Sequence, residues 1–320
     1  HTRYWRDWSS DVCSSDLMKL KKSGLGCYIG HIFAGALAYA DDVALIAPTI
    51  SSMNCMLNIC KEFADEYNVM FNVDKTKHME IGNNIADGDL FLNNILIDKV
   101  DHFLHLGNFI GSDMKGEDIK NSIGKFWSDV NIFMAQFSKV FPDMRYHLFK
   151  TYCMSLYGCQ LWDFSKKEVK DFYTAWRKAV RFVWKIPYIT HNDLLPHICD
   201  DLPIEVQLYR RFIKFFHKVI SSDNCLVRTC SFLALEGSCS PVCNSLNFIM
   251  SSYRLSKHNF FNHNLYQCLE KIGCLAVQSS DELKGTAILI RELCQARDGK
   301  LNTIMTRNEI VSCIEQLCVS

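Results

Sequence analysis

The chain has 320 residues, of which 48% are hydrophobic and 22% charged, and its 35 basic side chains balance 35 acidic ones. This length holds two domains with a sizeable core, and the composition excludes a chain that is disordered throughout. A net charge of zero counts against tight nucleic-acid binding by the molecule as a whole, so the local distribution of charge matters more.

The first 17 residues look foreign to the rest of the chain. Residues 7–17 back-translate into a common sequencing-adapter end, and no methionine precedes Met18. We expect residues 1–17 to be an assembly artefact and leave them out of the fold.

The next part of the chain predicts short strands around one helix. Residues 35–40 and 43–47 form a predicted hairpin, and apolar residues at helical spacing from Met53 to Tyr67 predict a helix that ends near Asn68. A turn is expected at Lys75. Further strands are predicted over 69–71, 78–81, 90–92, 95–97 and 103–110, with Asn93 and Asn94 in a hairpin turn and Gly107 near the middle of the last strand.

From Glu117 onward the spacing of apolar residues becomes helical. Helices are predicted over 117–139, 143–160, 166–184 and 203–221, with weaker ones over 244–254, 259–273, 281–295 and 306–318. The prolines fall between these segments, as helix breakers should: Pro142, Pro187, Pro196, Pro203 and Pro241. The composition changes near Asp113 to Lys115, where we place a domain boundary. The predicted fold class is α+β.

Sixteen cysteines are scattered along the chain rather than arranged as in a small secreted domain. We expect neither a signal peptide nor a membrane-spanning segment, because Asp41 and Asp42 interrupt the most apolar stretch. The prediction is an intracellular protein, in the cytoplasm or nucleus, whose cysteines are mostly reduced core residues.

The segment Tyr39-Ala40-Asp41-Asp42 carries the most specific chemical signal. Two adjacent carboxylates at the tip of an apolar hairpin are costly unless a cation or hydrogen-bond donors compensate them, and Mg²⁺ prefers oxygen ligands. An acidic pair that binds Mg²⁺ suits phosphoryl or nucleotidyl transfer. The plainer alternative is a solvated Asp-Asp turn, since Asp is an ordinary turn residue.

Three motifs in this order resemble the reverse transcriptases of non-long-terminal-repeat (LINE-type) retrotransposons. They are the Y-A-D-D hairpin with its flanks, the N-x-x-K-[ST] element at 72–76, and a segment similar to the primer grip at 102–109. The resemblance continues through residues 148–162, 176–181 and 186–191, and spans roughly 19–218. It implies a partial polymerase palm over 18–113, a helical thumb or connection over 114–200 and a helical carboxy-terminal region over 201–320.

The resemblance also implies roles for individual residues. Asp41 would bind Mg²⁺ directly, with Asp42 beside it in a lesser role and Tyr39 near the primer end. Lys75 would neutralise or protonate the leaving pyrophosphate, in a turn shaped by Asn72 and Thr76. Leu106 and Gly107 would place backbone against the primer, since glycine allows close approach. The plainer alternatives are a solvated lysine at 75 and a strand glycine with a packing role at 107.

One expected component is missing from the sequence. Polymerases of this family use a further Asp from an upstream strand, and the window from Met18 to Ala34 contains no Asp or Glu. Two carboxylates on one turn cannot fix two metal ions around the reacting groups. We therefore expect negligible polymerase activity from this chain alone, and a hairpin edge without its neighbouring strand.

Basic and aromatic side chains alternate between residues 166 and 185, and Arg177, Lys178 and Arg181 are candidate contacts for a nucleic-acid backbone. The alternative is that the aromatic residues face the core and the basic ones face solvent; we favour it for the aromatic residues and leave the basic face open. A second basic stripe, with the same two interpretations, comprises Arg210, Arg211, Lys214 and Lys218.

A zinc-like spacing occurs at Cys239, Cys243, His258 and His263. Chance matches are easy in a cysteine-rich chain, so we favour helices with core cysteines over a zinc site.

Three hypotheses follow from the sequence. The first is a fragment of an RNA-directed DNA polymerase that, when complete, joins a dNTP to a DNA primer on an RNA template with Mg²⁺. The second is a non-catalytic helical module that binds nucleic acid. The third is a zinc-dependent or purely structural helical protein.

Overall fold

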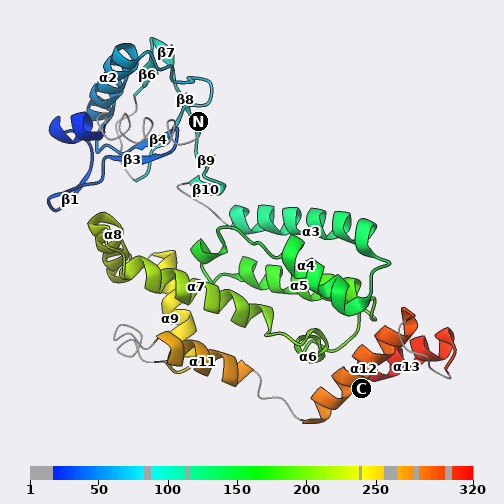
Figure 1. The fold of residues 1–320 in the computed structure, drawn as a ribbon. Helices are drawn as coiled ribbons and strands as arrows, with labels where there is room; N and C mark the ends of the chain where they lie inside the picture. The colour runs from blue at the N-terminus through cyan, green and yellow to red at the C-terminus, as the bar shows by residue number, and fades with distance from the viewer. Residues whose placement is uncertain are drawn as a thin grey trace, which may run out of the picture. The chain divides into compact units, whose positions relative to one another are not determined.

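The computed structural model describes residues 17–82, 88–111, 116–237, 240–255, 265–276, 281–299 and 305–319. The chain divides into two compact units, one of residues 1–115 with 222–231 and one of residues 116–221 with 232–320. The described part is mostly helical with a few small sheets, which is compatible with the α+β class (Figure 1). No helix in these ranges is both long and apolar enough to cross a membrane.

The first unit is organised around helix α2, Ile50–Tyr67. Thr49 caps its amino terminus, because the Thr49 hydroxyl accepts a hydrogen bond from the Ser52 N–H at 3.1 Å, and Asn68 ends the helix in the left-handed conformation. The buried face of α2 contributes to two small apolar clusters. Met56 and Cys60 pack with Leu20 and Ala36 in one cluster, and Leu57 packs with Leu90, Leu92 and Ile97 in the other.

Five two-stranded sheets are described in this unit. Four are antiparallel hairpins and one is a parallel pair: β1 (Tyr28–Ile29) with β2 (Ile32–Phe33), β3 (Ala36–Tyr39) with β4 (Asp42–Leu45), β6 (Phe91–Leu92) with β7 (Ile95–Leu96), β9 (His102–His105) with β10 (Asn108–Gly111), and, in parallel, β5 (Lys77–His78) with β8 (Asp98–Lys99). The hairpin predicted at Asn93 and Asn94 is confirmed, and both residues have positive φ, as in a type I′ hairpin turn.

Three strand predictions differ from the structure. In place of the strand predicted over 78–81, only Lys77–His78 forms a strand. Residues 69–71 form no strand, and Val69 and Met70 are exposed. The continuous strand predicted over 103–110 is a hairpin, with Leu106 and Gly107 in its turn. The alternation of apolar and polar residues is not interrupted at a two-residue turn. The sequence pattern therefore did not reveal the turn at Leu106 and Gly107.

The second unit consists of helices. Their bounds are α3 (Glu117–Phe137), α4 (Pro142–Cys153), the 3₁₀ turn η1 (Cys159–Leu161), α5 (Lys167–Trp184), α6 (Leu194–Cys199), α7 (Ile204–Ile220), α8 (Cys225–Glu236), α9 (Pro241–Ser252), α11 (Leu265–Ala276), α12 (Asp281–Arg297) and α13 (Arg307–Val319). The first residues of α8 group with the first unit. Sequence periodicity missed α6 and α8 and extended α4 seven residues too far. Pro196 does not separate helices: it lies in the first turn of α6, where its missing N–H costs nothing.

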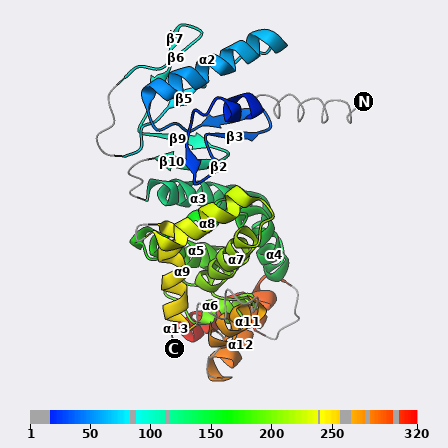
Figure 2. The ribbon, with the colours of Figure 1, turned by 90° about the vertical axis from the view of Figure 1, so that its left-hand side faces the viewer.

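One apolar core runs through this unit from Ile119 to Cys318. Helices α3, α4 and α5 lie side by side in both views (Figure 1, Figure 2). The Phe126 ring of α3 lies 5.4 Å from Phe172 of α5 and meets Phe149 of α4 edge to face at 6.2 Å, and Trp162, just after η1, meets Phe172 edge to face at 5.2 Å. The prediction that the aromatic residues of α5 belong to the core is confirmed for Phe172, Tyr173, Trp176 and Trp184, whereas Phe182 is exposed.

A fully buried arginine joins three segments of this core. The Arg145 guanidinium donates to the carbonyl oxygens of Val183 at 2.5 Å and Val140 at 2.7 Å, and pairs with the Asp298 carboxylate at 3.3 Å. Burial lowers the pKa of Arg145, and the Asp298 charge opposes that shift. Arg297 supports the same helix end, because it donates to the Trp184 carbonyl at 2.9 Å. The last carbonyls of α5, which have no donor within the helix, are therefore paired with cations.

We expect Arg145→Met to lower the free energy of unfolding of the helical unit by about 2–5 kcal/mol, because the substitution removes the Arg145 donor from the Val183 and Val140 carbonyls and leaves Arg297 as the remaining arginine beside the Asp298 carboxylate. Urea unfolding monitored by tryptophan fluorescence measures the change. The control is Lys284→Ala, which removes an exposed ion pair with Asp281 and should cost less than about 1 kcal/mol. Equal effects of the two substitutions would contradict the role of Arg145.

Candidate functional site

The β3–β4 hairpin is closed by a turn of two residues. Tyr39 pairs with Asp42, so only Ala40 and Asp41 form the turn. The hairpin continues at its base, where the Ile46 N–H donates to the Gly35 carbonyl at 2.8 Å and the Cys27 N–H donates to the Ile46 carbonyl at 2.9 Å. Asp41 at the tip and Asp42 at the first position of β4 therefore lie together at one end of the hairpin, and both are exposed.

The hairpin turn contains a strained residue. Ala40 has a φ of 53°, in the left-handed region that residues with a Cβ rarely adopt, whereas Asp41 has negative φ. Positive φ at the first central residue alone is the pattern of a type II′ turn, which normally has glycine there. Other turns of the chain, such as those at Asn93 and Leu106, also contain non-glycine residues with positive φ, so this conformation follows from the short connection and adds a local cost at the carboxylates.

We expect Ala40→Gly to stabilise the hairpin by about 0.5–1 kcal/mol, since glycine removes the cost of positive φ and loses part of the gain to its greater freedom in the unfolded chain. Hydrogen exchange of the β3 and β4 amides should slow accordingly. Ala44→Gly, in the middle of β4, is the control and should speed exchange. Faster exchange in Ala40→Gly would show that the positive φ is not strained.

The two carboxylates fit part of a site for a hard dication. Asp41 and Asp42 supply oxygen atoms at an exposed tip, where an ion can keep several of its waters, as Mg²⁺ does. A full two-metal site needs further ligands. The described residues contain no group of three or more His, Cys, Asp or Glu side chains that could hold a metal ion. The donors present therefore suit one ion held by two carboxylates and water.

The predicted turn at Lys75 is present and well defined. The Asn72 side-chain oxygen accepts from the Lys75 N–H at 3.1 Å, and the Thr76 hydroxyl donates to the Asn72 carbonyl at 2.8 Å. Both side chains thus shape the turn, and Lys75 is exposed. Phe71 and Val73 pack on the same apolar cluster as Leu45 of β4, so α2 supports both the turn and the acidic hairpin.

Leu106 and Gly107 form the turn of the β9–β10 hairpin, with φ of 47° and 77°. This places their peptide groups at a tip rather than in the middle of a strand. Glycine adopts the left-handed conformation of this turn at little cost, in addition to allowing any close approach of a ligand. Tyr39 is also displayed openly, with 67% of its surface exposed.

The three basic residues predicted on α5 have different environments. Arg181 is buried: its guanidinium donates to the Thr190 carbonyl at 2.6 Å and to the Asn192 side-chain oxygen at 2.8 Å, and burial lowers its pKa. Arg177 forms an ion pair with Glu205 of α7. Lys178 is exposed. Arg181 therefore holds a loop instead of facing solvent, and of the three only Lys178 presents its charge freely at the surface.

In the second basic stripe, Arg211 donates to the Met154 carbonyl at 3.0 Å, just beyond the end of α4, whereas Lys214 and Lys218 are exposed. Sequence periodicity alone does not distinguish an arginine that caps a helix end from one that faces solvent.

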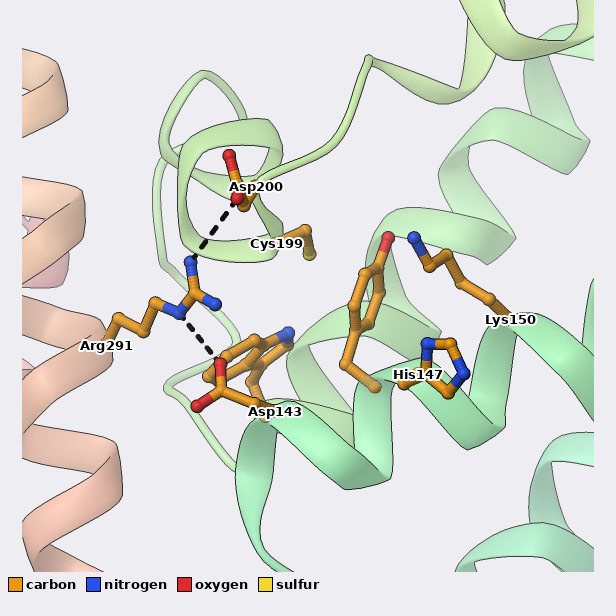
Figure 3. Close-up of a pocket in the computed structure, with 8 residues that line it drawn as sticks. Asp143, His147, Lys150, Cys199, Asp200 and Arg291 are labelled. Atoms are coloured by element: carbon orange, nitrogen blue, oxygen red, sulfur yellow. Dashed lines mark hydrogen bonds and ion pairs between the residues drawn. The ribbon is translucent and has the colours of Figure 1, made fainter.

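A small cavity of about 180 Å³ lies in the helical unit (Figure 3). Its charged groups already have partners: Arg291 pairs with Asp143 at 2.8 Å, and Lys150 pairs with Asp201 at 3.0 Å. The cavity is smaller than those that usually hold organic ligands. We interpret it as a gap inside a cluster of structural ion pairs that joins α4 to α12.

A polar cluster beside the parallel strands was not predicted from the sequence. Both ring nitrogens of His78 and one carboxylate oxygen of Glu80 are buried without a hydrogen-bond partner, and the second Glu80 oxygen accepts from Lys99 at 3.0 Å. His78 and Glu80 are two residues apart, which places both on the same side of an extended segment. This spacing is the sequence feature from which the cluster could have been predicted. Two side chains do not make a metal site.

Most of the described cysteines are buried, as expected: Cys60, Cys153, Cys159, Cys199, Cys243, Cys268, Cys294 and Cys318. Of the four zinc-like residues, Cys243 packs in helix α9 next to the Leu235 carbonyl, and Cys239, His258 and His263 lie outside the described residues.

Burial raises the pKa of Cys199 and Cys294 to about 12, so both remain protonated thiols near pH 8. We expect iodoacetamide at that pH to modify the exposed Cys55 while these two remain unmodified until the helical unit unfolds. Mass spectrometry of the alkylated peptides, with and without urea, measures the difference. Equal labelling of all three in the folded protein would contradict the buried positions.

Comparison with protein-family models, with curated proteins and with solved structures finds no match to this chain.

Proposed function

We propose that this chain is part of an RNA-directed DNA polymerase of the non-long-terminal-repeat retrotransposon type. The observation that carries the proposal is the strained two-residue turn that displays Asp41 and Asp42 side by side at an exposed tip. The ordered turn at Lys75 and the glycine-containing turn at Gly107 lie in the same unit, in the order that the sequence resemblance requires.

In this proposal the first unit corresponds to part of a polymerase palm, and the helical unit to a thumb and carboxy-terminal region. Asp41 and Asp42 would hold Mg²⁺, which supplies positive charge to the phosphates during nucleotidyl transfer. Lys75 would bind the negative charge that develops on the departing pyrophosphate. Tyr39, Leu106 and Gly107 would position the primer end. The RNA template, DNA primer and dNTP are the proposed partners.

Two carboxylates do not complete the site, so the proposal assigns synthesis to a longer protein that supplies a third acid. We expect the 320-residue chain alone to extend no primer on an RNA template. A protein that continues upstream of Met18 into its natural coding sequence should synthesise DNA with Mg²⁺. Asp41→Asn in that protein should reduce synthesis at least about 100-fold, because it removes a direct metal ligand.

Primer extension with labelled dNTPs measures this effect. Asp65→Asn, at an exposed position of α2, is the matched control and should retain full synthesis. Asp42→Asn should give an intermediate loss. Equal synthesis by the Asp41→Asn and Asp65→Asn proteins would exclude the hairpin as the catalytic element.

The alternative is a non-catalytic module that binds nucleic acid through its helical unit. The exposed lysines of α5 and α7, including Lys178 and Lys214, favour it. This alternative predicts that the helical unit binds RNA with an affinity that decreases as the salt concentration rises. The first unit would add nothing to that affinity.

A further inference from the structure

The loop that follows α5 holds two large apolar side chains in solvent. Tyr188 is 69% exposed and Ile189 is 65% exposed, although α5 ends in the core at Trp184 only a few residues earlier. Adjacent exposed apolar side chains mark contact sites more often than single ones do. The described residues of the helical unit do not cover this pair.

Buried hydrogen bonds fix the loop in place. Arg181 donates twice to the Thr190 carbonyl, at 2.6 and 3.2 Å, and Thr190 is only 1% exposed. The Thr190 hydroxyl and N–H both donate to the Pro187 carbonyl, at 2.6 and 3.1 Å, which closes a tight turn around Tyr188 and Ile189. The two side chains are therefore presented by a preorganised turn, and binding to them costs little ordering of the backbone.

The charge beside the ring is positive. The Lys178 ammonium lies over the Tyr188 ring, 5.9 Å from its centroid. The exposed residues of α5 also include Lys167 and Lys170, against the acid Asp171, while Glu168 is partly exposed. In the loop itself, His191 and Asp193 lie 3.6 Å apart, so Asp193 adds one carboxylate near the site. A ring covered on one face by the ammonium and still 69% exposed keeps its other face open.

We propose that Tyr188 is a stacking platform for a base of single-stranded nucleic acid, with Lys178 at the adjoining phosphate and Ile189 against the base edge. An open aromatic face next to a fixed cation matches the alternation of base and phosphate along a single strand. A duplex hides its base faces and offers only phosphates, so the arrangement selects a single strand. An acidic protein partner would use the lysines but would leave the open ring face without a specific role.

This site lies in the helical unit and uses none of the hairpin carboxylates. Its test measures binding rather than synthesis. Failure of one proposal therefore leaves the other standing.

The experiment is fluorescence anisotropy of a labelled oligouridine RNA titrated with the whole chain. Tyr188→Ala should weaken binding about five- to a hundredfold, the usual effect of removing one stacked aromatic side chain. Tyr188→Phe should bind as the native chain does, because stacking needs the ring and not the hydroxyl. Lys178→Ala should weaken binding and make the logarithmic salt dependence shallower by about one.

The matched control is Tyr157→Ala, since Tyr157 is 70% exposed in the same unit but no lysine of the described residues lies over its ring. It should change binding by less than about twofold. Thermal unfolding of each variant verifies the fold. The proposal is overturned by equal effects of Tyr188→Ala and Tyr157→Ala, or by equally tight binding of a duplex of the same length. Absence of RNA binding by the native chain also overturns it and would assign the surface to a protein partner.

Discussion

The register of the β3–β4 hairpin is the constraint on which the functional interpretation depends. Because Tyr39 pairs with Asp42, two residues must reverse the chain, and Ala40 adopts a left-handed conformation to allow it. A shift of one residue would turn every side chain of β4 to the opposite face. Ala36 and Leu45 at the base of the hairpin pack with α2, and this packing fixes the register that presents both carboxylates at the tip.

The helical unit uses its cations in two opposite ways. Arg145, Arg181 and Arg297 point inward and bind backbone carbonyls at helix ends and loops, where the flat guanidinium satisfies several acceptors at once. The lysines of α5 remain at the surface. These three arginines therefore stabilise helix ends and a loop, while Lys167, Lys170 and Lys178 leave a positive charge on the exposed face of α5.

Much of the local structure could be predicted from the sequence, for reasons that particular residues make clear. Helices with long apolar periodicity, such as α2 and α5, were found with nearly correct ends, since Asn68 and Lys185 end them in the left-handed conformation. Short elements were not found: α6 has six residues, too few to show a period. The turn at Leu106 was missed because alternation crosses it unchanged. The burial of Arg181 depends on Thr190 and Asn192, which lie in a loop whose path no spacing reveals.

The most direct measurement of the central claim is paramagnetic broadening by Mn²⁺, which takes the same oxygen ligands as Mg²⁺, in amide NMR spectra of the chain. We expect the amide signals of residues 39–43 to broaden first, excess Mg²⁺ to reverse the effect, and Asp41→Asn to abolish it. Broadening that is spread over exposed acids such as Asp65 and Asp281, and that Asp41→Asn leaves unchanged, would show that the acidic tip binds no ion specifically.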